Sequence, residues 1–364
     1  MLPSVVTSRR QLLQLMGSVV ALGTAAGCAP VRSGAPQLLS VKGDLPKAWL
    51  QELPSPWQSQ RLEGPEQLLS VVDRSALQEQ GLSSAALLAL GDGWAQQLDR
   101  ARLQPLEASA LLVQLAPMAQ APSRLFAPEG AVPVAFPWAF GTWLLVLRSR
   151  PDLWRQRQQG WSLLLDPSLR GKVVLPSSPR VVIELALRQL GLSSDDPQSL
   201  NAPALPKQVS ALVDQALALD ERDGLNLLLA GEADAAVVPS HRAIPLLKKD
   251  PRLSAVLPES GSPLWWQVLL RLAPRDRALL DPPLPLEWIR DGLSLPLLDR
   301  LLAAGWVPPL PRHQLEPVLR RWPERLRPLL LPSEAVLQRC NSLPVFSPAE
   351  RSRWQTLWDQ SLSR

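Results

Sequence analysis

The sequence predicts an α/β fold in two lobes with largely parallel sheets, and three observations support it. Short, continuous apolar runs such as Leu87–Leu90 are typical of strands buried on both faces of a parallel sheet. These runs alternate with stretches of helical apolar spacing along most of the chain, which favours α/β layers. The third observation is length, because removal of a predicted export signal (residues 1–27) from 364 residues leaves 337, too many for one simple core.

The first elements are expected soon after residue 36. A strand at Leu38–Val41 is followed by a turn and by a helix around Lys47–Leu53, whose first turn tolerates Pro46. The strand at Leu87–Leu90 stops at a Gly-Asp-Gly turn, and a helix begins near Trp94. Further strands are expected at Val132–Phe136, Trp143–Leu147, Val173–Leu175, Ala235–Val238 and Val268–Leu272.

Two helices in the middle of the chain carry clear signals. The helix over Arg180–Leu190 follows Ser177 and Ser178, which supply an N-cap, and Pro179, which suits the first helical position. Apolar residues within Gln208–Leu219 recur at helical spacing. The last quarter of the chain is expected to be helical, with prolines in the connections.

The first 28 residues predict export and lipid attachment. Arg9 and Arg10 precede an apolar run rich in small residues, Leu15–Ala26, which ends just before Cys28. A basic head, a hydrophobic segment and small residues before a cysteine form an export signal that ends in a lipidation site. The run is shorter than the apolar stretch that a membrane-spanning helix normally needs. The paired arginines resemble a twin-arginine signal and also suit a general secretory signal. We therefore expect a signal peptide at residues 1–27, lipidation at Cys28, a tether at residues 28–36 and a periplasmic, lipid-anchored protein.

Composition excludes several classes of protein. The formal net charge falls from +5 to +3 without the signal, which is no nucleic-acid footprint. His241 and His313 lie far apart and the chain has no tyrosine, so neither a histidine metal site nor tyrosinate-bound ferric iron is expected. If Cys28 is acylated, Cys340 has no disulfide partner and is expected to be buried rather than reactive. No phosphate loop, HExxH or nucleophile elbow occurs, so neither an enzyme nor a cofactor is expected.

Several stretches, taken in chain order, carry a family resemblance. The most specific runs from Asp166 to Leu190, and the carboxyl end from Phe346 to Trp358 adds a closing helix. Together they resemble the bacterial extracellular solute-binding proteins of ABC importers, closest to the spermidine/putrescine-binding type. The remaining stretches that carry this resemblance are Leu38–Leu53, Leu87–Gly93, Pro137–Thr142, Gly231–Ala236, Leu264–Gln267 and Gly305–Pro308.

The resemblance implies a type 2 periplasmic-binding-protein-like fold with an interlobe cleft. Ligands in such α/β proteins bind at the carboxyl ends of parallel strands. Crossings between the lobes are expected near Gly141–Trp143, near Trp265–Gln267 and after Trp306. Lobe 1 would comprise residues 37–141 plus 267–312, and lobe 2 residues 142–266 plus 313–364.

The charged ligand contacts of that family are replaced in this chain. Three of its acidic positions correspond to Ser178, Val181 and Gln267, and two of its aromatic positions correspond to Asp44 and Gly93. A buried ammonium group without a carboxylate costs several kcal/mol, so a polycation would bind poorly. The candidate ligand-binding residues that remain are Asp44, Asp92, Trp138, Ser178, Trp265, Gln267 and Trp306.

Each candidate also has a purely structural interpretation. Asp44 and Asp92 are equally suited to turns or caps, Ser178 to simple capping, and the tryptophans to core packing. As ligand contacts, Ser178 and the free amides of its helix would form a carboxylate cradle facing Asp44 or Asp92.

The resemblance implies a polyamine-binding-like substrate-binding lipoprotein of an ABC importer. It would capture a small solute between its lobes and deliver it to a permease in the inner membrane. Alternative hypotheses are a receptor for a zwitterion or small carboxylate, a structural or regulatory lipoprotein that has lost its ligand, and an exported enzyme on the same fold. The expected partners are the solute, the permease and the membrane that holds the lipid anchor, and the chain is expected to be a monomer without a nucleic-acid partner.

Overall fold

The amino-terminal strands form around the apolar runs at Leu38–Val41 and Leu87–Leu90. In the computed structural model these runs lie in β1 (Gln37–Val41) and β3 (Ala86–Gly91), which pair in parallel. A further strand, β2 (Gln58–Leu62), pairs in parallel with the other edge of β1. The helices of this region are α2 (Lys47–Leu50), which ends three residues earlier than expected, α3 (Pro65–Leu77) and α4 (Asp92–Ala95).

The structure describes residues 35–77, 86–196, 198–221, 223–273, 283–343 and 345–362. The expected signal peptide, Cys28 and nearly all of the expected tether lie outside these ranges. Residues 34–364 form one compact unit. The lobe boundaries expected within it therefore stay a prediction.

A second group of parallel strands forms in the middle of the chain. β5 (Val173–Leu175) lies between β6 (Ala216–Leu219) and β7 (Ala235–Pro239), and both pairs are parallel. Proline occupies the first turn of the helix that follows β5, as expected from Pro179. The helices of this region are α8 (Pro179–Gln189), α9 (Leu205–Val213), α10 (Gly224–Ala230) and α11 (Ser240–Lys249).

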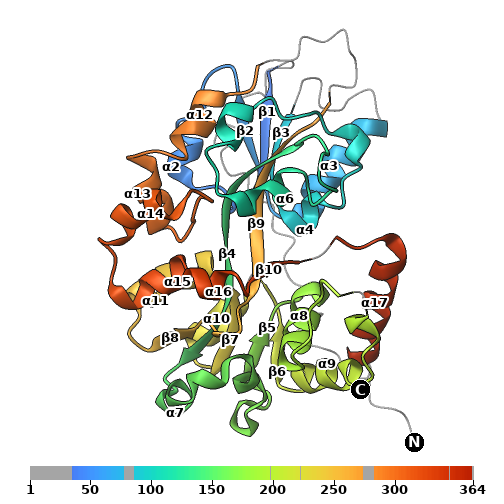
Figure 1. Ribbon diagram of the computed structural model, residues 1–364, viewed down its shortest axis with the longest axis vertical. Helices are drawn as coiled ribbons and strands as arrows, with labels where there is room; N and C mark the ends of the chain where they lie inside the picture. Colours follow the sequence, from blue (N-terminus) through green and yellow to red (C-terminus); the bar gives the residue numbers. More distant parts are fainter. Residues whose placement is uncertain are drawn as a thin grey trace, which may run out of the picture. The chain divides into compact units, whose positions relative to one another are not determined.

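Two long strands join the two parallel groups into one sheet. β4 (Ala135–Arg148) pairs with β9 (Pro263–Arg271) through residues 135–142 and with β7 through residues 143–147. Within the described residues, the strand order is β2-β1-β3-β9-β4-β7-β5-β6, with β8 (Leu253–Val256) on β4 and β10 (Asn341–Ser342) on β9. Figure 1 shows β4 and β9 side by side, running from the upper to the lower strands. The change of partner along β4 lies within the crossing expected at Gly141–Trp143.

The expectation of two separate strands in this region is wrong. The sequence predicts one strand at Val132–Phe136 and another at Trp143–Leu147, but residues 135–148 form a single strand. The ladder with β9 shifts register between Pro137 and Ala139, which accommodates a residue without an N–H donor. At Gly141 a Cβ atom would overlap the Ser240 hydroxyl and the Trp265 ring, so the glycine permits close packing instead of ending the strand.

Two other expectations also require correction. The sheet is mixed, because β4 runs antiparallel to β7, β8 and β9, and β9 also runs antiparallel to β3. A continuous apolar run indicates burial on both faces and not strand direction. The helix expected over Gln208–Leu219 is instead α9 followed by β6. Leu217 and Leu219 also match the two-residue period of a strand.

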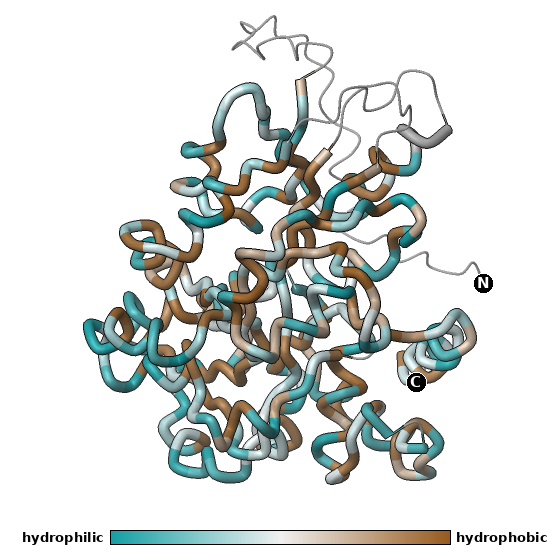
Figure 2. Tube along the Cα trace, turned by 45° about the horizontal axis from the view of Figure 1, so that its top comes forward, coloured by the Kyte–Doolittle hydropathy of each residue, from teal (hydrophilic) through white to brown (hydrophobic). Residues whose placement is uncertain are grey.

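The last quarter of the chain is helical and interrupted by prolines, as expected. Trp49 packs against α12 (Leu286–Asp291) of this region, and its Nε1 donates to the Trp288 carbonyl at 2.8 Å. Figure 2 shows hydrophobic stretches through the middle of the traced chain and hydrophilic residues on many outer loops. The helices of this region are α12 (Leu286–Asp291), α13 (Leu297–Ala303), α14 (Arg312–Leu319), α15 (Arg327–Leu330), α16 (Glu334–Leu337) and α17 (Pro348–Leu362). None of the helices in the described ranges has the length and apolar character needed to cross a bilayer.

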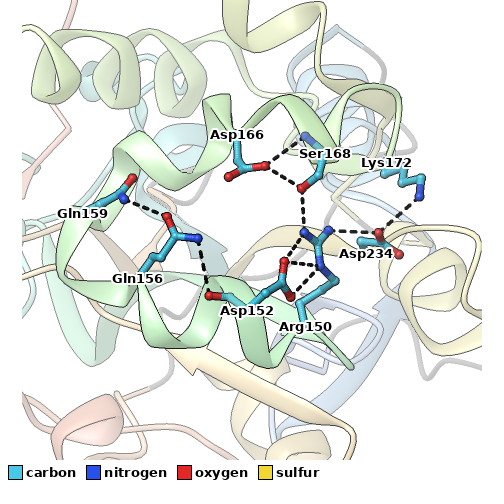
Figure 3. A network of polar contacts seen from close by, with 8 residues as sticks. All are labelled: Arg150, Asp152, Gln156, Gln159, Asp166, Ser168, Lys172 and Asp234. Carbon is cyan, nitrogen blue, oxygen red and sulfur yellow. Dashed lines mark hydrogen bonds and ion pairs between the residues drawn. The ribbon is translucent and has the colours of Figure 1, made fainter.

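A polar network holds the amino ends of β5 and β7. Arg150, at the end of β4, donates to Asp152 Oδ2 at 2.6 Å and to Asp234 Oδ2 at 3.1 Å (Figure 3). It also donates to Ser168 Oγ at 2.6 Å, and Lys172 Nζ lies 3.5 Å from Asp234 Oδ2. Asp234 directly precedes β7 and Lys172 directly precedes β5. The network therefore stabilises the amino ends of these strands, while residues after their carboxyl ends contribute to a pocket.

Candidate functional site

A pocket of about 560 Å³ lies where parallel strands of both groups end. Gly93 and Trp94 line it from the residues after β3, Ser177 and Ser178 from those after β5, and Glu221 from those after β6. Carboxyl ends of parallel strands are where α/β proteins bind ligands, because loops and helix N-termini converge there. The pocket position therefore agrees with the cleft that the sequence predicts.

The pocket wall combines aromatic rings with charges of both signs. The Phe346 and Trp354 rings lie 4.4 Å apart, and their contact holds the start of α17 against the pocket. The acidic residues on the wall are Glu66 and Glu221, and the basic ones are Arg180 and Arg351. A wall with two acids and two bases suits a ligand that carries both charges better than it suits a polycation.

Asp92 and Arg180 form a buried ion pair beside the pocket. Arg180 Nη2 lies 3.9 Å from Asp92 Oδ2, and the backbone N–H of Trp266 donates to Asp92 Oδ1 at 3.2 Å. Burial raises the pKa of Asp92, while the nearby Arg180 charge acts to lower it. Burial also lowers the pKa of Arg180. Asp92 is 6% exposed, so its charge depends on this partner for compensation.

The Arg180 guanidinium is held by groups that are distant in sequence. Its Nη2 donates to the Leu343 carbonyl at 3.0 Å, and its Cζ lies 5.8 Å from the Phe346 ring centroid. A Cβ atom on Gly93 would lie 2.6 Å from Arg180 Nη1. The guanidinium therefore occupies the space that a side chain at position 93 would need.

Ser178 is the one predicted site residue that lines this pocket as the structure describes it. It is the N-cap residue of α8, as expected, but its hydroxyl makes no capping hydrogen bond. Instead, its backbone N–H donates to Glu221 Oε1 at 3.1 Å. Asp92 lies beside the pocket and reaches it through Arg180.

The three predicted tryptophans lie together in an aromatic cluster. Trp138, Trp265 and Trp306 are 1%, 7% and 4% exposed. The Trp306 ring lies 5.0 Å from Trp138, 5.6 Å from Trp265 and 4.1 Å from His241. Trp265 also donates from Nε1 to the Thr142 carbonyl at 3.1 Å. In this conformation the tryptophans are core residues, and their role as ligand contacts stays a prediction.

Gln267 and Asp44 lie away from the described pocket wall. Gln267 is 7% exposed and packs beside Gly91, at the end of β3. Asp44 is half-buried in the turn after β1, and its N–H donates to the Val41 carbonyl at 3.1 Å. The structure therefore brings Asp92 and Ser178 to the pocket region, and places Gln267 against Gly91 and Asp44 in the turn after β1.

Sequence reasoning missed Arg180, Glu221 and the carboxyl-terminal segment as pocket residues. One signal for Arg180 was present, because a basic residue in the first turn of a helix opposes the helix dipole. Glu221 follows β6, a strand that the sequence pattern predicts as part of a helix. No local signal could place Phe346 against a helix that begins at residue 179.

A second pocket of about 470 Å³ has a mainly apolar wall that includes Phe140, Leu264 and Leu310. Cys340 borders it and is half-buried. The N–H of Ser262 donates to its Sγ at 3.3 Å, and burial raises the pKa of the thiol. A raised pKa lowers the thiolate fraction, which agrees with the unreactive cysteine that the sequence predicts.

Solved structures share this fold at low sequence identity. The spermidine/putrescine ABC transporter substrate-binding protein PotD of Streptococcus pneumoniae aligns with a TM-score of 0.68 at 17% identity, over 90% of this chain and 98% of that one. The Tp0655 (TpPotD) lipoprotein of Treponema pallidum gives 0.65 at 14%, over 90% and 99%. The Atu4243 GABA receptor gives 0.62 at 13%, over 90% and 97%. No family model and no curated protein matches the chain. The chain therefore has the two-lobed α/β fold of ABC solute-binding proteins, which confirms the predicted fold.

Proposed function

We propose that the chain is the solute-binding component of an ABC importer. The observation that carries this proposal is the pocket at the carboxyl ends of β3, β5 and β6, which draws its wall from both groups of parallel strands. A solute that contacts both groups favours the closed arrangement, and closure is the form in which such receptors deliver cargo. Similarity to solute-binding proteins with TM-scores up to 0.68 supports this function.

The ligand that the pocket suits best is a small zwitterion or carboxylate. Arg351 offers a partner for a carboxylate and Arg180 adds positive charge to the wall, while Glu66 and Glu221 offer partners for an ammonium group. A polyamine would need several carboxylates, yet the family's acidic positions correspond here to Ser178, Val181 and Gln267. PotD is described as a spermidine/putrescine-binding component and Atu4243 as a GABA receptor, so the fold accommodates both kinds of ligand.

The predicted export signal adds a location to the proposed function. Acylation of Cys28 would hold the receptor at the periplasmic face of the membrane, within reach of a permease. Mass spectrometry of the membrane-extracted chain tests this proposal. The expected product begins at a diacylated Cys28, and a membrane-free chain that retains residues 1–27 would contradict it.

Binding is tested by calorimetry and thermal shift on the chain with 4-aminobutyrate, amino acids, succinate, putrescine and spermidine. We expect a 4-aminobutyrate-like zwitterion or a carboxylate to stabilise the protein more than spermidine does. Arg351→Ala should weaken binding of that solute about two- to fivefold, because an exposed charge contributes little more. Arg353→Ala is the matched control, since Arg353 is also exposed on α17 and contacts Asn201 instead. Strong stabilisation by spermidine would contradict the assigned ligand class.

A second candidate function is a structural or regulatory lipoprotein that has lost its ligand. The burial of Trp138, Trp265 and Trp306 favours it, because these aromatic positions are used for packing in this conformation. The same experiments separate the two candidates. Absence of heat and of thermal shift with every solute would support the second.

A further inference from the structure

We propose that Arg180 is a built-in cation that fills the cation subsite of the cleft, so that the protein excludes amines from that subsite. The inference rests on the proposed function in one respect, because it takes the described pocket as the solute site. It deepens that function by naming the residue that sets the charge class of the ligand.

The contacts of the guanidinium are those that a cleft offers to a bound cation. A carboxylate oxygen of Asp92 lies 3.9 Å away, a backbone carbonyl of Leu343 accepts at 3.0 Å, and the Phe346 ring centroid lies 5.8 Å from Cζ. An anion, a carbonyl dipole and an aromatic face each attract a positive charge. They come from the start of α4, from Leu343 and from Phe346, whereas the cation itself comes from α8.

Gly93 provides the space for this arrangement. A Cβ atom there would lie 2.6 Å from Arg180 Nη1, so any larger residue displaces the guanidinium. Gly93 lies in α4 and its φ is not in the positive range, so other residues can adopt its backbone conformation. The position therefore uses the small size of glycine and not its conformational freedom.

Removal of Arg180 should convert the subsite into a site for free cations. Asp92 is 6% exposed and would lose its neighbouring charge, and a buried carboxylate without a counter-charge is strongly unfavourable. A small cation that enters the vacated space restores the pair. In the native protein the tethered guanidinium has the advantage of high effective concentration and competes with any free amine.

The test uses the full chain with propylguanidine and propylamine as cationic probes and 1-propanol as the neutral control. In Arg180→Ala we expect propylguanidine to bind about tenfold tighter than in the native protein, and propanol to have no effect. The double variant Arg180→Ala, Asp92→Asn should lose this gain. Equal affinity of propylguanidine for native protein and Arg180→Ala, or a gain that survives Asp92→Asn, would overturn the proposal.

A second pair of variants keeps the test valid if Arg180→Ala does not fold. Gly93→Ala displaces the guanidinium without deleting it, and Gly91→Ala is the matched control because a Cβ there lies 3.8 Å from its nearest neighbour. We expect propylguanidine to stabilise Gly93→Ala and not Gly91→Ala. The same response in both would overturn the proposal. Failure of the native protein to bind any solute would count against the proposed function alone, since these cation tests do not depend on the natural ligand.

Discussion

His241 packs against two rings of the aromatic cluster, Trp265 and Trp306. Its ring stacks on Trp306 at 4.1 Å and meets Trp265 edge-on at 4.5 Å. Among the described residues its Nδ1 has no hydrogen-bond partner. Burial lowers the pKa of His241 to about 3, and the charge of Arg242 acts in the same direction. The imidazole therefore stays neutral in the folded protein and behaves as an aromatic packing residue.

This burial predicts a pH dependence of stability that replacement of His241 removes. Below its ordinary pKa of 6.5 the histidine binds a proton in the unfolded chain but not in the folded one. The free energy of unfolding should therefore fall by about 1.4 kcal/mol per pH unit between about pH 6.5 and about pH 3 from this group alone. His241→Phe keeps the ring stack and should flatten this slope in urea unfolding.

His313→Gln is the matched control for that experiment. His313 is exposed on α14, so this variant controls for the loss of a histidine that does not stack on Trp306. A slope that persists in His241→Phe would show that other groups cause the acid sensitivity.

At the scale of elements, the polar network at the amino ends of β5 and β7 is centred on Arg150. The side chain of Arg150 is 14% exposed and contacts Asp152 and Asp234. The hydrogen bond from Arg150 is the main cause that lowers the pKa of Asp152 to about 2. A lowered carboxylate pKa stabilises the fold above its ordinary value of 3.8, and that contribution is lost as pH falls towards about 2.

We expect Arg150→Ala to reduce the free energy of unfolding by about 1–2 kcal/mol at neutral pH. The difference in free energy of unfolding between the variant and the native protein should become smaller as the pH falls from 3.8 to about 2. Arg252→Ala is the matched control, because Arg252 also pairs with an aspartate two positions away, Asp250, but outside a larger network. An equal loss of stability in both variants, measured by urea unfolding, would contradict a special role for the network.

The sequence predicted buried elements better than exposed ones. The apolar runs located β1, β3, β5, β7 and the second half of β9, because full burial leaves a continuous hydrophobic pattern. The edge strand β2 (Gln58–Leu62) was missed, since its central residues are polar and exposed. β6 was assigned to a helix because its few apolar residues match either period.

The candidate site could be predicted only in part, because side-chain direction is a tertiary property. Resemblance located the turns after β3 and β5, and both reach the pocket. It could not show that Arg180 points towards Asp92, or that the start of α17 closes the pocket wall. The predicted ligand contacts Trp138, Trp265 and Trp306 lie close together, but this proximity does not distinguish a ligand site from a packed core.

At the scale of the whole described unit, the continuity of β4 and β9 joins the two groups of strands. β4 exchanges its partner β9 for β7 between Thr142 and Trp143. Gly141 lies one residue before this exchange, where the Ser240 hydroxyl and the Trp265 ring occupy the space that a Cβ atom would need. Close packing at this point holds the two strand groups in register.

Gly141→Ala should therefore destabilise the protein by overpacking and not by altering the pocket. A Cβ at this position would lie 2.8 Å from Trp265 Cε2 and still closer to Ser240, so the strands must separate or the indole must move. Overpacking of this kind costs about 1–3 kcal/mol, measured as a fall in the urea midpoint. Adding Ser240→Ala should recover part of the loss, because it removes one of the two obstructing groups. A stability of Gly141→Ala equal to that of the native protein would mean that the crossing tolerates a wider separation, and that the two strand groups are less tightly coupled than their shared strands indicate.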